Sequence, residues 1–472
     1  MSTGYELVIL GQGSAAFAAA IKANDLGVKT AMVGSNATKG TVVGGTCVNV
    51  GCVPSKRLIT VGTLFHDASD NSFEGIHYGK GKLNFRQVIQ QKDELVRRFR
   101  REKYANVLKN LKQVTYYKGL GRFVSKNEVK VRDKTLTADK FLIATGARPN
   151  LPKVKGIEKI DYLTNEEALS LTELPESMCV VGGRALGLEF AQMYAQLGTD
   201  VTVLQRSVRI LPDGEPEVSD VLTEHLEERG ITIHTDVTLN WVGEKGNRKI
   251  INAYVDGKVF NVTCEQLLFA TGRTPNTNHL DLPNAGVKTD EHGFVVVNDE
   301  MQTSAPHVWA AGDVIGEPML ETIAAKEGAV AVGNAFGQEK KKIAFNEVPS
   351  AVFTYPEVAS VGLTEAQAEE RGIKCSCTIL PLDTVPKARI IGETRGVVKL
   401  VINRETKQIL GLHMVAPHAA DLIHEGVLAV KFKLSIDNII DTVHVFPTLS
   451  EGVKLAAQSF YKDVGQLSCC TE

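Results

Sequence analysis

Two cysteines separated by four residues are the most reactive feature of the sequence. Cys47 and Cys52 lie in the glycine-rich stretch Gly-Gly-Thr-Cys-Val-Asn-Val-Gly-Cys-Val-Pro-Ser-Lys at residues 44–56. A helix or turn could bring the two sulfur atoms within bonding distance, although the spacing alone does not prove it. Cys52 is expected near the start of a helix, whose N-terminus would stabilise a thiolate together with the nearby Lys56. The pair is a candidate redox centre, and two ordinary buried cysteines are the alternative.

The N-terminal residues that precede this loop predict a dinucleotide-binding unit. An apolar strand at residues 5–10 leads into Gly11-Gln12-Gly13-Ser14-Ala15-Ala16, an alanine-rich helix and a second strand at residues 29–33. Gly11 would make the tight turn, Gly13 would let the backbone approach a pyrophosphate, and the small Ala16 would let the helix pack on the strand. The helix N-terminus would bind the phosphates.

The same pattern returns at residues 179–204, where a strand leads into Gly182-Gly183-Arg184-Ala185-Leu186-Gly187, a helix and another strand. Arg184 stands where the middle glycine is usual. Two such units argue for two bound dinucleotides, whereas a single-cofactor dehydrogenase needs only one. Cys179 and Cys264 lie in apolar, strand-like runs and are expected to be unreactive core thiols.

The length and composition predict a multidomain globular enzyme. The 472 residues exceed the usual limit of a single core, and the net charge of −2 gives no sign of a nucleic-acid partner. No apolar stretch is long enough to span a membrane and no secretory signal is evident, so a cytoplasmic location is expected. We divide the chain into 1–150 and 274–345 for the first dinucleotide domain, 151–273 for the second, and 346–472 for an interface domain.

The cysteine loop, the repeated dinucleotide pattern and Gly312-Asp313 closely resemble the flavoprotein disulfide reductase family, over essentially the whole chain. The resemblance implies an α/β fold with two Rossmann-like domains and a C-terminal α+β dimerisation domain, as in glutathione reductase. FAD would bind the first Rossmann unit, a nicotinamide cofactor the second, and a homodimer would share its active sites. Cys52 would be the flavin-facing thiol and Cys47 the interchange thiol, with Lys56 near flavin N5 and paired with Glu189. The residues expected at the cofactors are Gly11, Gly13, Ala15, Ala16, Gly45, Thr46, Lys56, Thr145, Gly146, Gly182, Gly187, Glu189, Arg206, Arg209, Gly272, Arg273, Gly312 and Asp313.

Two positions bear on how each dinucleotide is held. The family usually has an acidic residue at the end of the second FAD strand, but here the strand ends Met32-Val33-Gly34-Ser35, so backbone groups or Ser35 would hold the ribose. After the second unit, Arg206 and Arg209 stand where NADH-binding proteins place a carboxylate. Guanidinium groups suit the 2′-phosphate of NADPH, which we favour over two incidental surface arginines.

The residue that would transfer a proton to a disulfide substrate is missing. Disulfide-reducing members have a histidine directly before a Pro-Thr pair and a glutamate four residues beyond that proline. Here Phe446 precedes Pro447-Thr448, while Glu451 is present. A phenyl ring cannot transfer a proton. His444 is displaced by two residues and is a weak candidate to take over that role.

The C-terminal sequence, Leu-Ser-Cys-Cys-Thr-Glu, suggests a different substrate. Cys469 and Cys470 form a vicinal pair suited to a soft metal ion, because thiolates select soft cations. An incidental surface pair and a redox-active tail are the alternatives. The tail resembles that of mercuric reductases, which lack the catalytic histidine and carry a Glu-Lys-Tyr segment found here as Glu102-Lys103-Tyr104. Their tyrosine lies at the metal site. The mobile N-terminal metal-binding domain of many members is not seen in this sequence.

The sequence therefore predicts NADPH-dependent reduction of mercury(II) to elemental mercury through FAD and the Cys47–Cys52 pair. Thiol-bound mercury would be captured by Cys469 and Cys470 of one subunit and passed to Cys47 and Cys52 of the other. The principal alternative is a disulfide reductase of the glutathione reductase or dihydrolipoamide dehydrogenase type. A flavin-dependent transhydrogenase or quinone reductase, and a non-catalytic protein that sequesters soft metals, are further alternatives.

Overall fold

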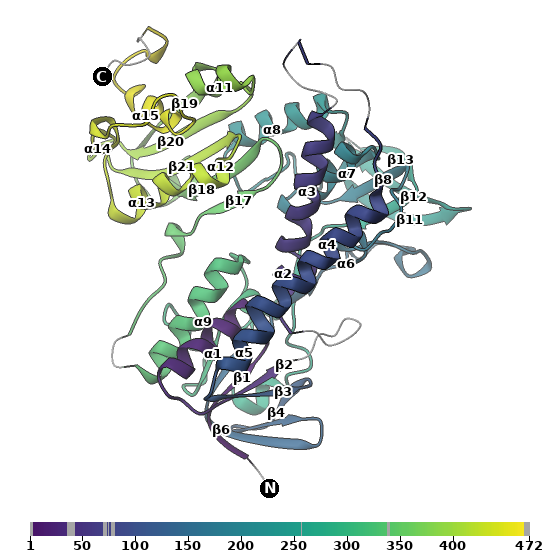
Figure 1. The fold of residues 1–472 in the computed structure, drawn as a ribbon, viewed down its shortest axis with the longest axis vertical. Helices are drawn as coiled ribbons and strands as arrows, with labels where there is room; N and C mark the ends of the chain where they lie inside the picture. Colours follow the sequence, from purple (N-terminus) through teal and green to yellow (C-terminus); the bar gives the residue numbers. More distant parts are fainter. Residues whose placement is uncertain are drawn as a thin grey trace. The chain divides into compact units, whose positions relative to one another are not determined.

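The computed structural model describes residues 3–34, 43–68, 73, 75–76, 81–255, 257–337 and 340–466 (Figure 1). The chain forms two compact units, each assembled from three stretches of sequence. Unit 1 comprises Met1–Ser55, Ile89–Asn150 and Gly272–Phe345. Unit 2 comprises Lys56–Val88, Leu151–Thr271 and Asn346–Glu472.

Unit 1 is built on a seven-stranded sheet in the order β3-β2-β1-β6-β5-β4, with β16 also paired to β6. The parallel strands are β1 (Thr3–Leu10), β2 (Thr30–Gly34), β3 (Val114–Lys118), β6 (Lys134–Ile143) and β16 (Val308–Ala310). The antiparallel strands are β4 (Gly121–Ser125) and β5 (Glu128–Val131). Residues 7–10 of β1 are all buried, as expected for a parallel strand covered on both faces.

The helices α1 (Ser14–Asp25) and α9 (Glu321–Phe336) lie side by side in unit 1 (Figure 1). Their close approach depends on Gly328, where a Cβ atom would lie only 2.0 Å from the carbonyl oxygen of Ala15. The remaining elements are α2 (Thr46–Val50), most of α4 (Phe85–Arg100), the π-helical turn η1 (Arg101–Ala105), α5 (Asn106–Asn110), the short helices η3 (Leu282–Ala285) and η4 (Asp313–Ile315), and the paired strands β7 (Ala147–Pro149) and β15 (Arg273–Pro275).

Unit 2 contains a four-stranded parallel sheet in the order β10-β9-β8-β14. Its strands are β8 (Ser177–Val181), β9 (Asp200–Leu204), β10 (Thr232–His234) and β14 (Gln266–Phe269). The associated helices are α3 (Cys52–Asp67), α6 (Asn165–Ala168), α7 (Ala185–Leu197) and α8 (Pro216–Glu228). An antiparallel sheet of β11 (Thr238–Lys245), β12 (Arg248–Val255) and β13 (Lys258–Cys264) accompanies it. Cys179 and Cys264 are buried in this core, with 0% and 2% of their surface exposed.

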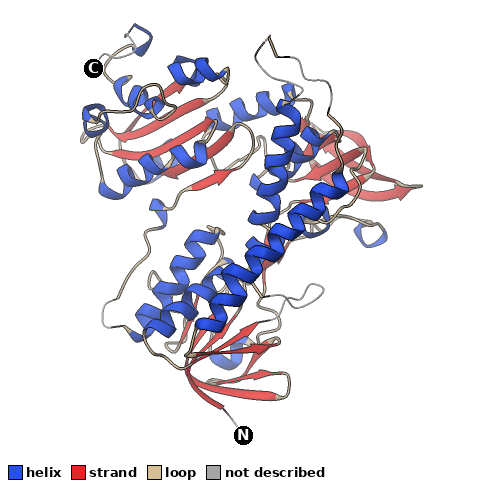
Figure 2. Cartoon of the chain, in the orientation of Figure 1, coloured by secondary structure: helices blue, strands red, loops and turns tan. Residues whose placement is uncertain are grey.

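A second, five-stranded sheet completes unit 2, in the order β17-β18-β21-β20-β19. Its strands are β17 (Ser350–Val352), β18 (Glu357–Gly362), β19 (Cys375–Pro381), β20 (Val397–Asn403) and β21 (Ile409–Ala416), and every neighbouring pair is antiparallel. One face packs against helices that follow the sheet in sequence (Figure 2). These are α12 (Ala419–Leu422), α13 (His424–Phe432), α14 (Ile436–Asp441) and α15 (Glu451–Gln458). The short helices α10 (Glu365–Glu370) and α11 (Pro386–Ile391) complete this part.

A buried ammonium group on β20 anchors α8 to this sheet. Lys399 is 1% exposed, and its Nζ lies 2.9 Å from carboxylate oxygens of Glu215, Glu217 and Glu365. A buried charge is tolerated in proteins when it is paired and hydrogen-bonded, as this one is. Within the described ranges, no helix is both long and apolar enough to cross a membrane.

Candidate active site

A short helix and a longer one that meet at a glycine bring the loop cysteines together. Cys47 lies in α2, and Cys52 is the first residue of α3. Gly51 makes the break between the helices, with φ −130° and ψ −120°. A Cβ atom at Gly51 would lie 2.9 Å from the carbonyl oxygen of Thr46 and 3.0 Å from the Cα of Cys47, so only glycine fits without displacement. The expected position of Cys52 at a helix N-terminus is what the structure shows.

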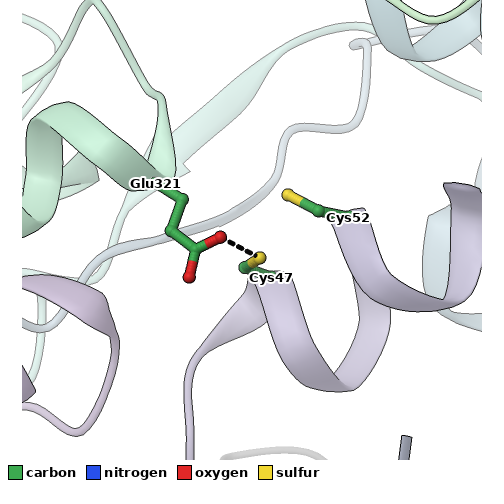
Figure 3. A group of neighbouring side chains, drawn as sticks. All are labelled: Cys47, Cys52 and Glu321. Atoms are coloured by element: carbon green, nitrogen blue, oxygen red, sulfur yellow. Dashed lines mark hydrogen bonds between the residues drawn. The ribbon is translucent and has the colours of Figure 1, made fainter. Parts of the chain in front are cut away.

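Glu321, the first residue of α9, joins the two cysteines (Figure 3). The Cys47 thiol donates a 2.6 Å hydrogen bond to the Glu321 carboxylate. The two sulfur atoms and a carboxylate oxygen all lie within 4.8 Å of one another. The pKa of Cys47 is raised by its hydrogen bond to Cys52, by burial and by the neighbouring Glu321 carboxylate. Cys47 therefore keeps its proton in this arrangement.

Glu321 is not predictable from the sequence. It is 274 residues from Cys47 in the chain, and no motif marks it. Ser14, in the first turn of α1, donates a 3.2 Å hydrogen bond to its other carboxylate oxygen. The packing of α1 against α9 therefore positions the acid beside the thiols. Its one sequence signal is its place at the start of a helix a few residues after Gly312-Asp313.

Tyr104 lies in the π-helical turn η1 and faces the same cluster. Its ring packs edge-on against Phe17, with centroids 4.9 Å apart, and its hydroxyl is hydrogen-bonded to Ser14. Burial, followed by the negative charge of Glu321, raises the pKa of Tyr104 to about 12. The phenol is therefore neutral and able to donate a hydrogen bond. Single π-helical turns inside helices are frequent at functional sites.

Gly11 of the first dinucleotide motif and Gly45 of the cysteine loop pack too tightly to carry side chains. Gly11 has φ +147°, and a Cβ atom there would lie 2.0 Å from the carbonyl oxygen of Ala144. A Cβ atom on Gly45 would lie 2.6 Å from the Cα of Gly13. Ala15 and Ala16 are buried, at 5% and 0% exposure. Bare backbone at Gly13 and Gly45, next to the N-terminus of α1, suits the pyrophosphate of a dinucleotide.

An ion pair lies among the glycine turns at Gly146, Gly272 and Gly312 of unit 1. Arg273 follows Gly272 and lies 3.3 Å from the carboxylate of Asp313. The Arg273 guanidinium is also 3.5 Å from the hydroxyl of Thr46. Burial raises the pKa of Asp313, while the charge of Arg273 opposes that shift.

Two hydrogen bonds hold the turns on either side of this ion pair. The hydroxyl of Thr145, which precedes Gly146, donates a 2.9 Å hydrogen bond to the carbonyl of Asn276. The N–H of Gly312 donates to Glu327 at 2.7 Å. The structure thus brings predicted residues from four separate segments of unit 1 together.

The missing acidic residue at the end of β2 has a steric explanation. A Cβ atom at Gly34 would lie 2.6 Å from the side-chain oxygen of Gln12. Tyr116 stabilises this arrangement, because its hydroxyl donates hydrogen bonds to the side-chain oxygen of Gln12 at 2.6 Å and to the carbonyl of Gly34 at 3.1 Å. Ser35, the other expected ribose partner, lies outside the described residues.

The second dinucleotide motif has the same crowded geometry. Gly182 has φ +122°, and a Cβ atom there would lie 2.3 Å from the carbonyl oxygen of Ala270. A Cβ atom on Gly187 would lie 1.9 Å from the carbonyl oxygen of Gly182. Arg184, which replaces the middle glycine, directs its guanidinium to Asp213 in an exposed ion pair. The substitution is accommodated because the backbone at residue 184 is extended, with φ −98°.

A neutral residue follows β9, where a carboxylate would repel a phosphate. Gln205 is buried and uses its side-chain amide internally, accepting from the N–H of Gly183 at 2.9 Å and donating to the carbonyl of Arg209. Arg206 is exposed and Arg209 is half-buried. No hydrogen bond or ion pair of either guanidinium is found among the described residues. Both cations are therefore available to an anionic ligand.

The expected pair of Lys56 and Glu189 is present in unit 2. The Lys56 ammonium donates a 2.6 Å hydrogen bond to one carboxylate oxygen of Glu189. The N–H of Phe353 donates a 3.0 Å hydrogen bond to the other oxygen. Lys56 also lies 4.6 Å from the centroid of the Phe353 ring. Glu189 is nearly buried on α7, so the ammonium is held by a rigid partner.

In the segment that precedes α15, the exposed aromatic ring is the phenyl ring of Phe446, and the imidazole of His444 is turned to other partners. Phe446 is 46% exposed. His444 instead bonds to Glu425 at 2.9 Å and to the carbonyl of Thr442 at 3.0 Å, so both ring nitrogens are engaged. Glu451 accepts from the N–H of Thr448 at 3.4 Å. These contacts oppose an acid–base role for His444. Cys469 and Cys470 lie outside the described residues.

Two family models match the chain. The pyridine nucleotide-disulphide oxidoreductase model matches residues 5–328, and the dimerisation domain of the same family matches residues 348–457. The chain belongs to the pyridine nucleotide-disulphide oxidoreductase family, which confirms the expected fold class. It is an oxidoreductase that uses a flavin and a pyridine nucleotide. The crowded glycine turns at the starts of α1 and α7 fit two such cofactors.

The chain is similar to mercuric reductases along nearly its whole length. It is 43% identical to the mercuric reductase of Staphylococcus aureus over 466 residues, which span 99% of this chain and 84% of that protein. It is 40% identical to the mercuric reductase of Streptomyces lividans, covering 99% and 98% of the two chains. Among solved structures, the HOCl-induced flavoprotein disulfide reductase RclA from Escherichia coli matches with a TM-score of 0.85 and 26% identity, covering 97% of this chain and 100% of that one.

Proposed function

We propose that this protein reduces mercury(II) to elemental mercury with NADPH as the electron donor and FAD as the bound flavin. The observation that carries the proposal is the dithiol of Cys47 and Cys52, hydrogen-bonded to Glu321 in a chain that has Phe446 where disulfide reductases have a base. Soft mercury(II) binds thiolates, and its reduction requires no proton for a departing thiol. Likeness to mercuric reductases over 99% of the chain supports this substrate.

Cys47 and Cys52 would bind mercury(II) by ligand exchange. Two protein sulfur–mercury bonds form, two bonds to small carrier thiolates break, and the proton of the Cys47 thiol moves to a released thiolate. When bound, FAD would accept a hydride from NADPH and supply two electrons to this site. The ion then becomes neutral mercury and leaves both thiolates. Tyr104, with its neutral phenol beside Cys47, would donate a hydrogen bond to a thiolate or to a mercury ligand.

Three further assignments rest on the chain's own residues. Arg206 and Arg209 would bind the 2′-phosphate of NADPH, because no carboxylate follows β9 and Gln205 is neutral. Lys56, held by Glu189, would lie at the flavin. A homodimer would share its active sites, with Cys469 and Cys470 of one subunit delivering mercury to the other, and the match to a dimerisation domain supports the assembly.

Acceptor specificity tests the proposal. NADPH oxidation by the purified flavoprotein would be followed under excess small thiol with mercury(II), glutathione disulfide or lipoamide as acceptor. We expect mercury-dependent oxidation with release of volatile mercury and little disulfide activity. Robust disulfide reduction without mercury turnover would overturn the proposal and favour a disulfide reductase, the class named for the structural relative RclA.

A further inference from the structure

Glu321 gives the loop dithiol a third donor atom of a different kind. Its carboxylate accepts a 2.6 Å hydrogen bond from the Cys47 thiol, and a carboxylate oxygen lies within 4.8 Å of both sulfur atoms (Figure 3). Among the described residues, Cys47, Cys52 and Glu321 are the only group of three such side chains whose donor atoms converge. Two sulfur donors and one oxygen donor form a ligand set that the two thiols alone do not provide.

The carboxylate is held toward the thiols by its own surroundings. Ser14 donates a 3.2 Å hydrogen bond to Oε1 of Glu321, while Oε2 accepts from Cys47. Glu321 is the first residue of α9, where the N-terminus of the helix favours a negative charge. The ion pairs found in the described part of the chain do not include Glu321. One carboxylate oxygen is therefore engaged only by a thiol proton, which a metal ion can replace.

The spacing of the three donors suits a small dication with tetrahedral geometry. Zinc(II) bonds to cysteine sulfur at about 2.3 Å and to carboxylate oxygen at about 2.0–2.2 Å. Tetrahedral angles then separate the two sulfur atoms by about 3.8 Å, and each sulfur from the oxygen by about 3.6 Å. Both separations lie inside the 4.8 Å that already encloses the three donor atoms. Loss of the thiol proton lets the 2.6 Å contact lengthen by the roughly 1 Å that this geometry requires.

We propose that Cys47, Cys52 and Glu321 form a three-ligand site for zinc(II) in the reduced protein, with water or a small thiol as the fourth ligand. Two sulfur–zinc bonds and one oxygen–zinc bond form, and bound waters leave the ion. The protons that the two sulfur atoms carry pass to solvent, and nothing is oxidised or reduced. Because a disulfide offers no thiolate, the site exists only while both cysteines are reduced.

This inference rests on the dithiol of the proposed function and concerns the range of ions that the dithiol holds. Mercury(II) is soft and is satisfied by two sulfur donors, whereas zinc(II) also takes an oxygen donor. Zinc(II) has no redox chemistry, so electrons from a flavin do not convert it to a neutral atom that leaves. Bound zinc(II) should therefore block the dithiol and compete with mercury(II).

Cobalt(II) is a coloured substitute for zinc(II) that reports this site without turnover. The parent is the full-length flavoprotein with Cys469→Ser and Cys470→Ser, reduced with a phosphine and desalted without oxygen. We expect about one cobalt(II) per subunit, with sulfur-to-cobalt charge-transfer absorbance and the visible bands of a four-coordinate ion, and zinc(II) should remove both. Cys47→Ser with Cys52→Ser should abolish these bands, as should oxidation of the parent to the disulfide.

Two variants of the carboxylate separate coordination from charge. Glu321→Gln should lower the affinity for cobalt(II) by about a hundredfold, because losing even an outer-shell partner of a metal costs about 10–100-fold. Glu321→Asp keeps the negative charge but shortens the side chain, and it should lower the affinity nearly as much. Glu291→Gln, an exposed change in the same unit, is the control, and flavin content checks the fold of each variant. Affinity kept in either Glu321 variant, or a parent without sulfur-to-cobalt absorbance, would overturn the site.

Mercury turnover by the wild-type protein distinguishes this inference from the proposed function. Reduction of mercury(II) by a protein whose dithiol binds no cobalt(II) would refute the zinc site alone. Cobalt(II) bound by the three side chains in a protein that does not reduce mercury(II) would refute the proposed function and support the zinc site.

Discussion

At the scale of the residue, the acid beside the thiols distinguishes this site. Glu321 accepts a hydrogen bond from the Cys47 thiol, while Ser14 and the start of α9 hold its carboxylate in place. A negative group so close opposes ionisation of the thiol. The two cysteines are thereby made unequal, with the proton kept on Cys47.

Glu321→Gln should make Cys47 ionise at lower pH. The amide removes a negative charge that contributes to the raised pKa of Cys47, so that pKa should fall by about one unit or more. The pH dependence of Cys47 alkylation in the reduced protein measures it. Glu291→Gln, an exposed change in the same unit, is the control and should leave the profile in place. An unshifted profile in Glu321→Gln would show that Cys52 and burial alone set this pKa.

Arg206→Ala with Arg209→Ala should lower kcat/KM for NADPH by about a hundredfold or more while changing that for NADH little. The two guanidinium groups are available, and each charge-assisted hydrogen bond to a phosphate contributes about 1.5–3 kcal/mol. Steady-state kinetics with both nucleotides measures the ratio. Arg248→Ala, which breaks an ion pair with Glu176 elsewhere in unit 2, should leave the ratio unchanged. Equal losses for both nucleotides would contradict the assignment.

At the scale of the element, α9 links the first dinucleotide motif to the thiols. Its first residue is Glu321, Glu327 accepts from the N–H of Gly312, and Gly328 contacts the backbone of α1. One helix therefore sets the position of the acid, the Gly312 turn and the helix that begins at Ser14.

Gly328→Ala should destabilise unit 1 by about 1–3 kcal/mol and weaken flavin retention. The added Cβ atom meets the carbonyl of Ala15 at 2.0 Å, so the helices must separate. Gly333→Ala is the matched control on the same helix, because its nearest neighbour would be the flexible Lys22 side chain at 3.9 Å. Thermal unfolding and flavin content after gel filtration measure both variants. The control should be neutral or slightly stabilised.

Glu327→Gln should flatten the pH dependence of stability. Burial raises the pKa of Glu327 from 4.5 to about 7, only partly offset by the hydrogen bond from Gly312. The folded state then binds this proton more tightly, which stabilises it below the ordinary pKa, and the benefit is lost as pH rises through about 7. Urea midpoints between about pH 5 and pH 8 should fall by more in wild type than in the variant. Parallel profiles would contradict the assignment.

The sequence predicts the dinucleotide units well, because strand, glycine turn and helix are local patterns. Gly11, Gly13 and Gly182 occupy the turns that their spacing predicts, and Gly187 lies in the first turn of α7 against the carbonyl of Gly182. Glu321 was not predictable, because only the packing of α1 on α9 brings it to Cys47. The same holds for Gln205, whose amide reaches back to the N–H of Gly183. Contacts between distant segments depend on tertiary geometry, which no short motif records.

Of the residues that bear on the substrate, some could be predicted from the sequence and others could not. The replacement of the catalytic histidine by Phe446 is evident from the Pro-Thr pair that follows it, and the structure places the phenyl ring on the surface. The hydrogen bond between His444 and Glu425 could not be predicted, because Glu425 lies on α13, 19 residues away in the sequence. The delivery role of Cys469 and Cys470 stays a prediction.

At the scale of the whole molecule, we expect the exposed apolar segment before α15 to contact a second subunit. Val443, Val445 and Phe446 are 88%, 74% and 46% exposed, within the region that matches a dimerisation domain. Contiguous exposed apolar side chains of this kind indicate a protein interface.

Val445→Glu should weaken dimerisation, because a carboxylate would have to be desolvated in the interface. Sedimentation velocity should show a larger monomer fraction, and turnover should fall with it if the active site is shared. Val259→Glu, at a position 58% exposed on β13, is the control and should remain dimeric. A dimer that tolerates Val445→Glu would place the interface elsewhere.

The assembly of unit 1 from three stretches has a consequence for biosynthesis. Synthesis runs from the N-terminus, and β1, α1 and the loop cysteines emerge long before β16 and α9. A nascent chain therefore displays Cys47 without Glu321, and α1 without the helix that covers it, until residue 336 has left the ribosome. During that interval the thiols are open to metal ions and oxidants present in the cell. Incomplete chains can thus bind, through these thiols, the toxic ion that the finished protein is proposed to remove.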